Sequence, residues 1–294
     1  MTHKQDAPSN DFPLPGWQVV EANGADAGAF LQAQLMNDVR AVAPGHWQWN
    51  GWLNPKGRMI ALFALVALDA NRFWMIAPDF PAADLAARMQ RFVFRSKVKL
   101  AAREDSTATG AFAPPARAQR SAFDGITAID CECIEFDLGS EGQPRTLRIA
   151  TTQSPDGNQR HGCELAEQAS RWLAFDLAHG LPRLSVDQSE AWTPQMLSLD
   201  RLNAYSLKKG CYPGQEIVAR THYLGQAKRG LVRAVGTGLQ IGAEIRAGKR
   251  VLGTVVSCVD TEALAVLSTD RPAAGWECCG MACQEVALQD GLER

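Results

Sequence analysis

The most distinctive stretch of this chain is Lys208-Lys209-Gly210-Cys211-Tyr212-Pro213-Gly214-Gln215-Glu216. It sets one thiol beside two ammonium groups, and cationic neighbours favour the thiolate form in which cysteine is a nucleophile or a metal ligand. Gly210 and Gly214 permit backbone conformations and close approaches that a side chain forbids. Pro213 is able to open a helix, which would place Cys211 just before a positive helix end. The stretch predicts a functional loop around Cys211, and a tight basic turn with an incidental cysteine is the plainer alternative.

The same stretch resembles the signature of the YgfZ-type folate-binding proteins, within the superfamily of the aminomethyltransferases (the T-proteins of glycine cleavage). The likeness continues through Ile217-Val218-Ala219-Arg220 and Lys228-Arg229. Further blocks keep the same order: Trp17, Gly24-Ala25-Asp26, Phe30-Leu31-Gln32, Asn37-Asp38-Val39, Lys56-Gly57, Phe94, Ser96-Lys97-Val98, Trp172-Leu173-Ala174, Gly180, Pro182 and Pro194-Gln195. The resemblance spans the chain from Trp17 to Leu231. It implies two ferredoxin-like halves and a C-terminal β-barrel around a central folate cavity.

The residue patterns independently predict an α+β protein. Apolar residues recur at helical spacing within Asp26–Asp38, after Pro81 and across Glu164–His179, where Gly180 suits the helix C-cap. After Arg229, short β-branched runs alternate with Gly and Pro turns, which is typical of a small antiparallel barrel. We expect a disordered tail (1–11), a folate-binding body (12–227, with halves at about 12–110 and 120–227) and a barrel (228–290). Residues 103–121, rich in Ala, Arg, Thr and Pro, are expected to form an exposed connector.

Composition limits the classes of function. At 294 residues the chain has room for two or more domains, and its net charge of −2 gives no sign of a general nucleic-acid binder. Residues 1–16 lack an apolar signal region, and the apolar run Met59–Leu68 is too short to span a bilayer. We therefore expect a cytoplasmic protein without membrane association or strong direct binding of nucleic acid.

The chain has eight cysteines, which in a sequence this long do not indicate a disulfide scaffold. Cys278, Cys279 and Cys283 invite comparison with a metal site, but no histidine or second spaced cysteine pair completes a zinc pattern. Buried structural thiols explain them better, because free cysteine behaves as a small hydrophobe. No metal site is therefore predicted.

Other side chains of the signature loop have two interpretations each. Glu216 and Arg220 are four residues apart and form either a solvated helix pair or a ligand contact. Tyr212 either stacks on a ligand or packs. His222 offers a Cys–His pair with Cys211, although no third orienting group accompanies it. The remaining motif residues that we expect to shape the loop are Lys208, Lys209, Gly210, Gly214 and Gln215.

Trp17 and Trp172 are the candidate folate contacts. Flat heteroaromatic ligands suit pockets lined by large aromatic side chains, although most tryptophans in a protein are core residues. The resemblance implies that these two positions contact tetrahydrofolate or a folate derivative.

Two other positions depart from the superfamily. Ala61 stands where aminomethyltransferases have their catalytic aspartate, and Ala178 stands where a glutamate anchors the pterin ring.

The resemblance implies a tetrahydrofolate-binding protein that supports assembly or repair of iron–sulfur clusters, with indirect effects on tRNA modification. Its partners would be folate and iron–sulfur enzymes or their assembly machinery, and Cys211 would be the working thiol. A folate-dependent one-carbon transferase or demethylase is the first alternative, although Ala61 supplies no titratable group for the usual acid–base step. A thiol redox or cluster-carrier protein that does not use folate is the second.

Overall fold

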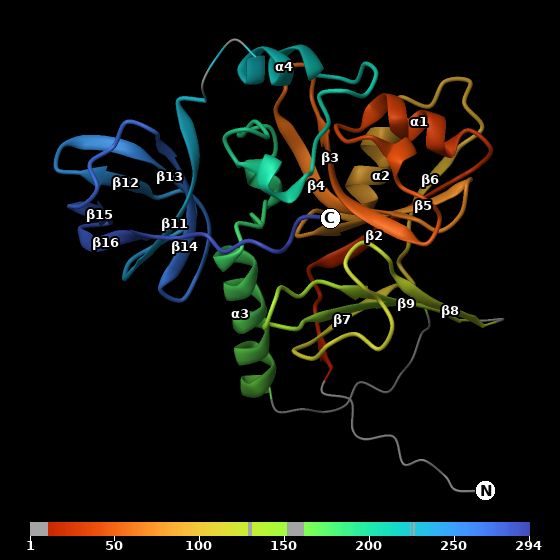
Figure 1. The fold of residues 1–294 in the computed structure, drawn as a ribbon, viewed down its shortest axis with the longest axis horizontal. Helices are drawn as coiled ribbons and strands as arrows, with labels where there is room; N and C mark the ends of the chain where they lie inside the picture. The colour runs from red at the N-terminus through yellow and green to blue at the C-terminus, as the bar shows by residue number, and fades with distance from the viewer. Residues whose placement is uncertain (1–10, 129–130, 152–161, 224, 226) are drawn as a thin grey trace, which may run out of the picture.

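The structure is a computed structural model that describes residues 11–128, 131–151, 162–223, 225 and 227–294. Within these residues the chain forms two five-stranded sheets, a set of helices and a closed six-stranded barrel (Figure 1). The predicted α+β fold with a C-terminal antiparallel barrel is confirmed. The tail predicted at 1–11 lies outside the described residues except for Asp11, whose carboxylate pairs with Arg148 at 2.6 Å.

The first sheet lies between a pair of helices and the central core. Its strand order is β3 (His46–Leu53), β4 (Met59–Ala67), β5 (Arg72–Pro78), β2 (Trp17–Asn23) and β6 (Lys99–Ala102). Every residue of β4 is buried because both of its faces are covered. One face, with Phe63 and Leu65, packs under α1 (Ala27–Gln34) and α2 (Ala82–Gln90). The other, with Leu62 and Val66, faces the central core.

The helix expected over Asp26–Asp38 is shorter in the structure. It ends at Gln34 because Leu35 adopts an extended backbone conformation and forms an isolated bridge with Trp52 on β3. The chain then continues into a short 3-10 turn, η1 (Val39–Ala41). The apolar periodicity beyond Gln34 therefore arises from a segment packed on the sheet and not from a continued helix.

The second sheet has the order β1 (Phe12–Pro13), β7 (Thr107–Ala111), β10 (Thr146–Ala150), β9 (Cys131–Asp137) and β8 (Asp124–Ala128). The prediction of an exposed connector at 103–121 is therefore wrong, because β7 lies within this range. The small residues that suggested a connector have a packing role. A Cβ added to Gly110 would lie 2.8 Å from the ring of Trp172, so the strand needs a residue without a side chain there.

Helix α3 (Gly162–Ala178) lies beside the second sheet and the barrel (Figure 1). Its end confirms the predicted C-cap at Gly180, which has φ +71°. The amide of Gly180 donates to the carbonyl of Leu177, and that of Leu181 donates to the carbonyl of Asp176. This pair of bonds is the Schellman arrangement, which glycine favours because of its left-handed backbone.

The barrel follows a further helix, α4 (Gln215–Tyr223), and its core contains Trp276 and Ile245. Two short strands that the sequence analysis did not predict, β12 and β15, complete its closure. The division between body and barrel near residue 228 stays a prediction. The strand order is β11 (Arg229–Gly236), β14 (Glu262–Ser268), β13 (Arg250–Val259), β12 (Glu244–Ala247), β15 (Trp276–Cys278) and β16 (Met281–Val286).

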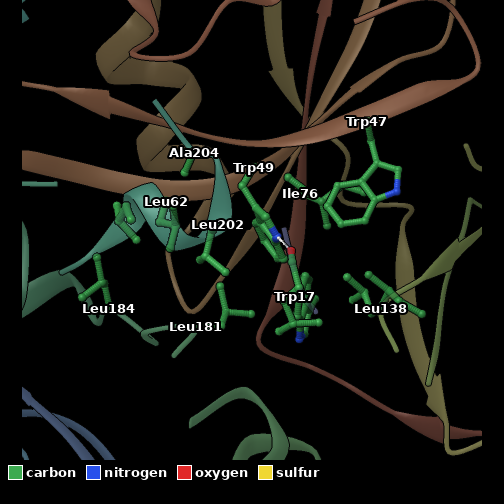
Figure 2. Packing of buried hydrophobic residues seen from close by; sticks show 14 of the residues in the cluster. Trp17, Trp47, Trp49, Leu62, Ile76, Leu138, Leu181, Leu184, Leu202 and Ala204 are labelled. Atoms are coloured by element: carbon green, nitrogen blue, oxygen red, sulfur yellow. Dashed lines mark hydrogen bonds between the residues drawn. The ribbon is translucent and has the colours of Figure 1, made fainter. Parts of the chain in front are cut away.

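Side chains from both sheets and from the chain after α3 meet in the centre of the molecule. Figure 2 shows Trp17, Trp49, Leu181 and Leu202 converging there, the last from the short turn η3 (Leu199–Leu202). The indole of Trp49 donates to the carbonyl of Leu292 at 2.8 Å, which fastens the C-terminal segment over this core. In the part of the chain that the structure describes, no helix has the length and apolar character needed to cross a membrane.

Candidate functional site

The signature loop is anchored at its start by Lys209. This side chain is buried, and its ammonium donates hydrogen bonds to the carbonyls of Gln32 (2.6 Å), Leu35 (2.5 Å) and Asn37 (3.1 Å). These carbonyls lie at and just after the C-terminal end of α1, where a cation is favoured by the helix dipole. Burial lowers the pKa of Lys209 to about 8, with Asp38 opposing the shift.

At its far end the loop contacts the turn between β3 and β4. Gly214 has φ +79°, and a Cβ there would lie 2.6 Å from the carbonyl oxygen of Asn54 and 2.7 Å from the Cα of Gly57. Glycine is therefore required both by the backbone conformation and by the close approach. The left-handed residue also explains why Pro213 does not open the helix as expected. Helix α4 begins after it, at Gln215.

The side chain of Gln215 closes the loop on itself. Its amide nitrogen donates to the carbonyl of Lys209 at 3.2 Å, so the first and last parts of the loop are joined directly. Tyr212 is buried inside this ring of contacts, with the Lys209 ammonium 5.1 Å from its ring centroid. Burial raises the pKa of Tyr212 above its ordinary value. The loop is therefore held by polar bonds around one packed aromatic residue.

Cys211 is exposed at the tip of this loop. Lys208 is exposed beside it, whereas the Lys209 ammonium is directed into α1. A Cβ added to Gly210 would meet nothing within 4 Å, so the space before the thiol is open. His222 lies at the other end of α4, where its ring contacts Tyr223. Over the described ranges, no three His, Cys, Asp or Glu side chains are placed to hold a metal ion together.

Glu216 and Arg220 form the predicted i,i+4 pair, with 2.6 Å between carboxylate and guanidinium. Their side chains are 79% and 62% exposed. A pair so open to solvent contributes at most about 0.5 kcal/mol to stability. The geometry is that of the solvated helix pair, the plainer of the two interpretations.

The two candidate tryptophans are joined by a chain of buried ions. The guanidinium carbon of Arg183 lies 5.6 Å from the centroid of Trp17, and that of Arg145 lies 4.0 Å from the centroid of Trp172. Both arginines pair with the carboxylate of Asp176, at 3.0 Å and 2.7 Å. The carboxylate and the Arg145 side chain are fully buried. We call these five residues the tryptophan network.

The two rings differ in their access to a ligand. Trp17 lines a cavity of about 510 Å³ between the first strands of the two sheets, next to the start of α2. Its Nε1 is buried and has no hydrogen-bond partner among the described residues. Trp172 is 1% exposed, with Arg145 over its ring and Gly110 against its edge. Trp17 is itself only 4% exposed but borders this cavity, whereas Trp172 is covered.

The two positions that depart from the superfamily are both buried. Ala61 is on β4, opposite Trp52 on β3. After Ala178, the ring of His179 stacks on Phe175 with 4.2 Å between centroids. The Nδ1 of His179 lies 2.9 Å from the carbonyl of Asp290 and must donate its proton to that oxygen. The histidine is therefore a bonded core residue and does not replace the missing carboxylate.

The sequence analysis did not identify Arg145 or Arg183 as members of a site. Neither belongs to a motif, and Arg145 comes from a Gln-Pro-Arg-Thr run that reads as a turn before a strand. The sequence feature that could have indicated these arginines is Asp176. A carboxylate on the apolar helix that carries Trp172 and Leu177 must be paired if it is buried.

The chain is similar to several known proteins. Residues 16–137 match the model of the GCVT N-terminal domain. A protein of Haemophilus influenzae whose function is uncharacterized is 28% identical over 267 residues, which cover 86% of each chain. A relative in Cronobacter sakazakii, named as the tRNA-modifying protein YgfZ, is 27% identical over 269 residues, covering 85% of this chain and 80% of the relative.

A relative in Sodalis glossinidius with the same name is 27% identical over 248 residues, covering 78% of this chain and 74% of the relative. The fold resembles that of the glycine cleavage system aminomethyltransferase T from Bartonella henselae, with a TM-score of 0.70. That match has 18% identity and covers 97% of this chain and 86% of the other. Together these similarities support a YgfZ-type member of the GCVT superfamily.

Proposed function

We propose that this protein binds tetrahydrofolate or a folate derivative in the cytoplasm and supports the assembly or repair of iron–sulfur enzymes. An effect on tRNA modification, the activity in the names of its relatives, would then be exerted through such enzymes. The observation that carries the proposal is the presentation of Cys211: an exposed thiol on a loop fixed at both ends.

Cysteine thiolates are the usual ligands of iron–sulfur clusters. A resident cluster needs several such ligands, whereas Cys211 stands at the loop tip without a neighbouring cysteine in any described contact. One preorganised thiol is suited to a transient bond with a cluster or with a damaged site on another protein. Rigid anchoring by Lys209 and Gly214 supports this role because a binding group loses less entropy when it is already held in place.

The cavity beside Trp17 supports folate binding. A pteridine ring is flat and suits an indole, and its nitrogen and oxygen acceptors would match the unpartnered Nε1 of Trp17 once that buried atom is uncovered. Bound tetrahydrofolate would supply a reduced carrier of one-carbon groups. Trp172 would contact the ligand only after Arg145 leaves its ring, so we propose that folate binding opens the tryptophan network.

Loss of the thiol tests the cluster role. In cells that lack this protein, the wild-type chain should restore the activity of iron–sulfur enzymes, most visibly under oxidative stress. Cys211→Ala should fail to restore it. Cys279→Ala is the matched control and should restore activity fully. Cys279 is an exposed thiol in the barrel, which corrects the expectation that it is buried like Cys278 and Cys283. Full rescue by Cys211→Ala would remove the thiol from the proposed function.

Calorimetric titration with tetrahydrofolate tests the ligand. Trp17→Ala should weaken binding by about 1–3 kcal/mol, the contribution expected from a buried aromatic contact. Trp276→Phe is the control, since that indole is buried in the barrel core. Absence of binding to the wild-type protein would favour a folate-independent thiol carrier. Steady formation of methylenetetrahydrofolate from an amine donor would favour a one-carbon transferase.

A further inference from the structure

A strongly basic segment lies between α2 and β6. From Leu85 to Arg103 the chain contains six cations and no carboxylate, although the whole protein has 30 basic and 32 acidic residues. The cations are Arg88, Arg91, Arg95, Lys97, Lys99 and Arg103. Net charge conceals this concentration, because acidic residues elsewhere in the chain balance it.

Two phenylalanines in the same segment are exposed. Phe94 is 86% exposed and Phe92 is 45% exposed, the former being the most exposed of the large hydrophobic residues that the structure describes. Phe92 is held in place by Trp52, with ring centroids 5.7 Å apart and the rings nearly perpendicular. Exposed aromatic side chains gathered in one place mark a binding surface more often than single scattered ones do. We call residues 91–99 the Phe94 surface.

The cations of this surface are free to meet a partner. Arg91, Arg95, Lys97 and Lys99 are exposed, and none of them forms an ion pair with another described residue. The flanking cations differ. Arg88 lies over the ring of Phe80, and Arg103 pairs with Glu21 and Asp105.

The Phe94 surface is linked to the signature loop by a chain of residue contacts. Phe92 packs on Trp52, and Trp52 forms the isolated bridge with Leu35. The carbonyl of Leu35 accepts a hydrogen bond from the ammonium of Lys209, two residues before Cys211. Figure 1 shows the chain of this loop passing beside α1, the helix to which Lys209 is bonded. A chain of contacts through Trp52 and Leu35 therefore links Phe92 to Lys209, the anchor of the thiol loop.

The chemistry of the surface selects the kind of partner. Unpaired cations favour an acidic partner, and interface cores are enriched in Phe and Arg. Of the two rings, Phe94 is open to a partner at 86% exposed, whereas Phe92 is held against Trp52. The thiol on the loop to which this surface is linked is a ligand for soft metal ions and clusters. We infer that the Phe94 surface docks an acidic iron–sulfur protein and brings it to Cys211, an inference that rests on the proposed function.

Site-specific photocrosslinking in cells tests this directly. p-Benzoylphenylalanine placed at position 94 should form adducts with acidic iron–sulfur proteins. The same probe at Ile241, 54% exposed and outside this surface, should not. Combining Arg91→Glu and Arg95→Glu should lower the yield of those adducts roughly tenfold, because the encounter is steered by charge. Adducts with RNA or lipid, the same proteins at both positions, or no adduct at position 94 would each overturn the inference.

Complementation separates this inference from the proposed function. Phe94→Ser should restore roughly tenfold less iron–sulfur enzyme activity than the wild type, the loss expected for an aromatic interface anchor. Its thermal unfolding should match that of the wild type, because the ring is exposed. Ile241→Ser, the matched control, should restore activity fully. Failure of the wild type would refute the proposed function, whereas equal rescue by Phe94→Ser and Ile241→Ser would refute the docking inference alone.

Discussion

The signature loop and the tryptophan network hold candidate functional residues by opposite means. The loop keeps Cys211 in solvent, and bonds from Lys209 and Gln215 to backbone carbonyls fix its ends. The network keeps Trp172 out of solvent by stacking Arg145 on the ring and pairing that arginine with Asp176. The first arrangement leaves the thiol accessible to solvent. The second closes a surface that must open before a ligand can use it.

This difference indicates where change occurs on binding. Burial of the Lys209 ammonium lowers its pKa to about 8, but the charge is offset by three carbonyls at and just after the end of α1, groups that a helix end otherwise leaves unpaired. Buried ions are costly to desolvate and are stable only when paired. An incoming ligand that offers new partners to Arg145 can therefore rearrange the network, whereas the loop has no reason to move.

The largest effect is expected from breaking the network at Asp176. Asp176→Asn keeps the shape of the side chain but leaves two buried guanidinium groups without their shared charge. Removal of one partner from a buried ion pair usually costs about 3–5 kcal/mol. Urea unfolding at neutral pH would measure the loss. Glu216→Gln, which breaks an exposed pair on α4, is the control and should change stability by less than about 0.5 kcal/mol.

A loss below about 1 kcal/mol for Asp176→Asn would contradict this view of the network. It would mean that water or side-chain rearrangement already relieves the buried charges, and that Trp172 is more accessible than its 1% exposure indicates.

The second effect concerns the contact between the loop and the β3–β4 turn. Gly214→Ala adds a Cβ to a residue with φ +79° and drives it against the carbonyl of Asn54. Backbone strain and overpacking together should lower the free energy of unfolding by about 2–4 kcal/mol. Gly210→Ala is the control in the same loop, since its Cβ would meet nothing within 4 Å. Equal losses for the two variants would show that the loop does not depend on this contact.

Much of the loop could be predicted from its sequence because its requirements are local. Glycine, proline and a cationic pair within nine residues indicate a constrained turn beside a thiol. What could not be predicted is the direction of Lys209. Its acceptors lie some 170 positions earlier in the chain, at residues 32, 35 and 37. Sequence spacing gives no sign of such a contact, and an ammonium next to a cysteine is naturally assigned to that cysteine.

The network was less accessible to sequence analysis because its members come from distant segments. Arg145, Asp176 and Arg183 meet only when the second sheet, α3 and the following chain pack together. The prediction of a connector at 103–121 failed for a related reason. Small residues such as Gly110 look like a linker in isolation, yet they make room for Trp172. In both places the structure is decided by tertiary packing, and local composition alone gives a different prediction.

The third prediction removes the polar anchor of the loop. Lys209→Met keeps the apolar stem but leaves three carbonyls near α1 without their donor. Loss of a charged hydrogen-bond donor at a buried position should lower stability by about 1–2 kcal/mol at pH 7. It should also change the rate at which iodoacetamide alkylates Cys211, because the loop is less fixed. Lys208→Met, at the neighbouring exposed lysine, should change neither quantity appreciably, and an equal effect of the two variants would contradict the anchoring role.

The smallest effect is expected from His179, at the end of the helix that carries Trp172 and Asp176. Burial lowers the pKa of His179 below its ordinary value of 6.5. As pH falls through 6.5, the unfolded chain therefore binds more protons than the folded one, and stability present at neutral pH is lost. The loss between pH 7 and pH 5 should be about 1 kcal/mol or less. His179→Asn should remove this part of the acid sensitivity in urea unfolding. The same acid sensitivity in His179→Asn and in the wild type would show that this ring takes up a proton without disturbing the end of α3. The tryptophan network would then be uncoupled from that helix end.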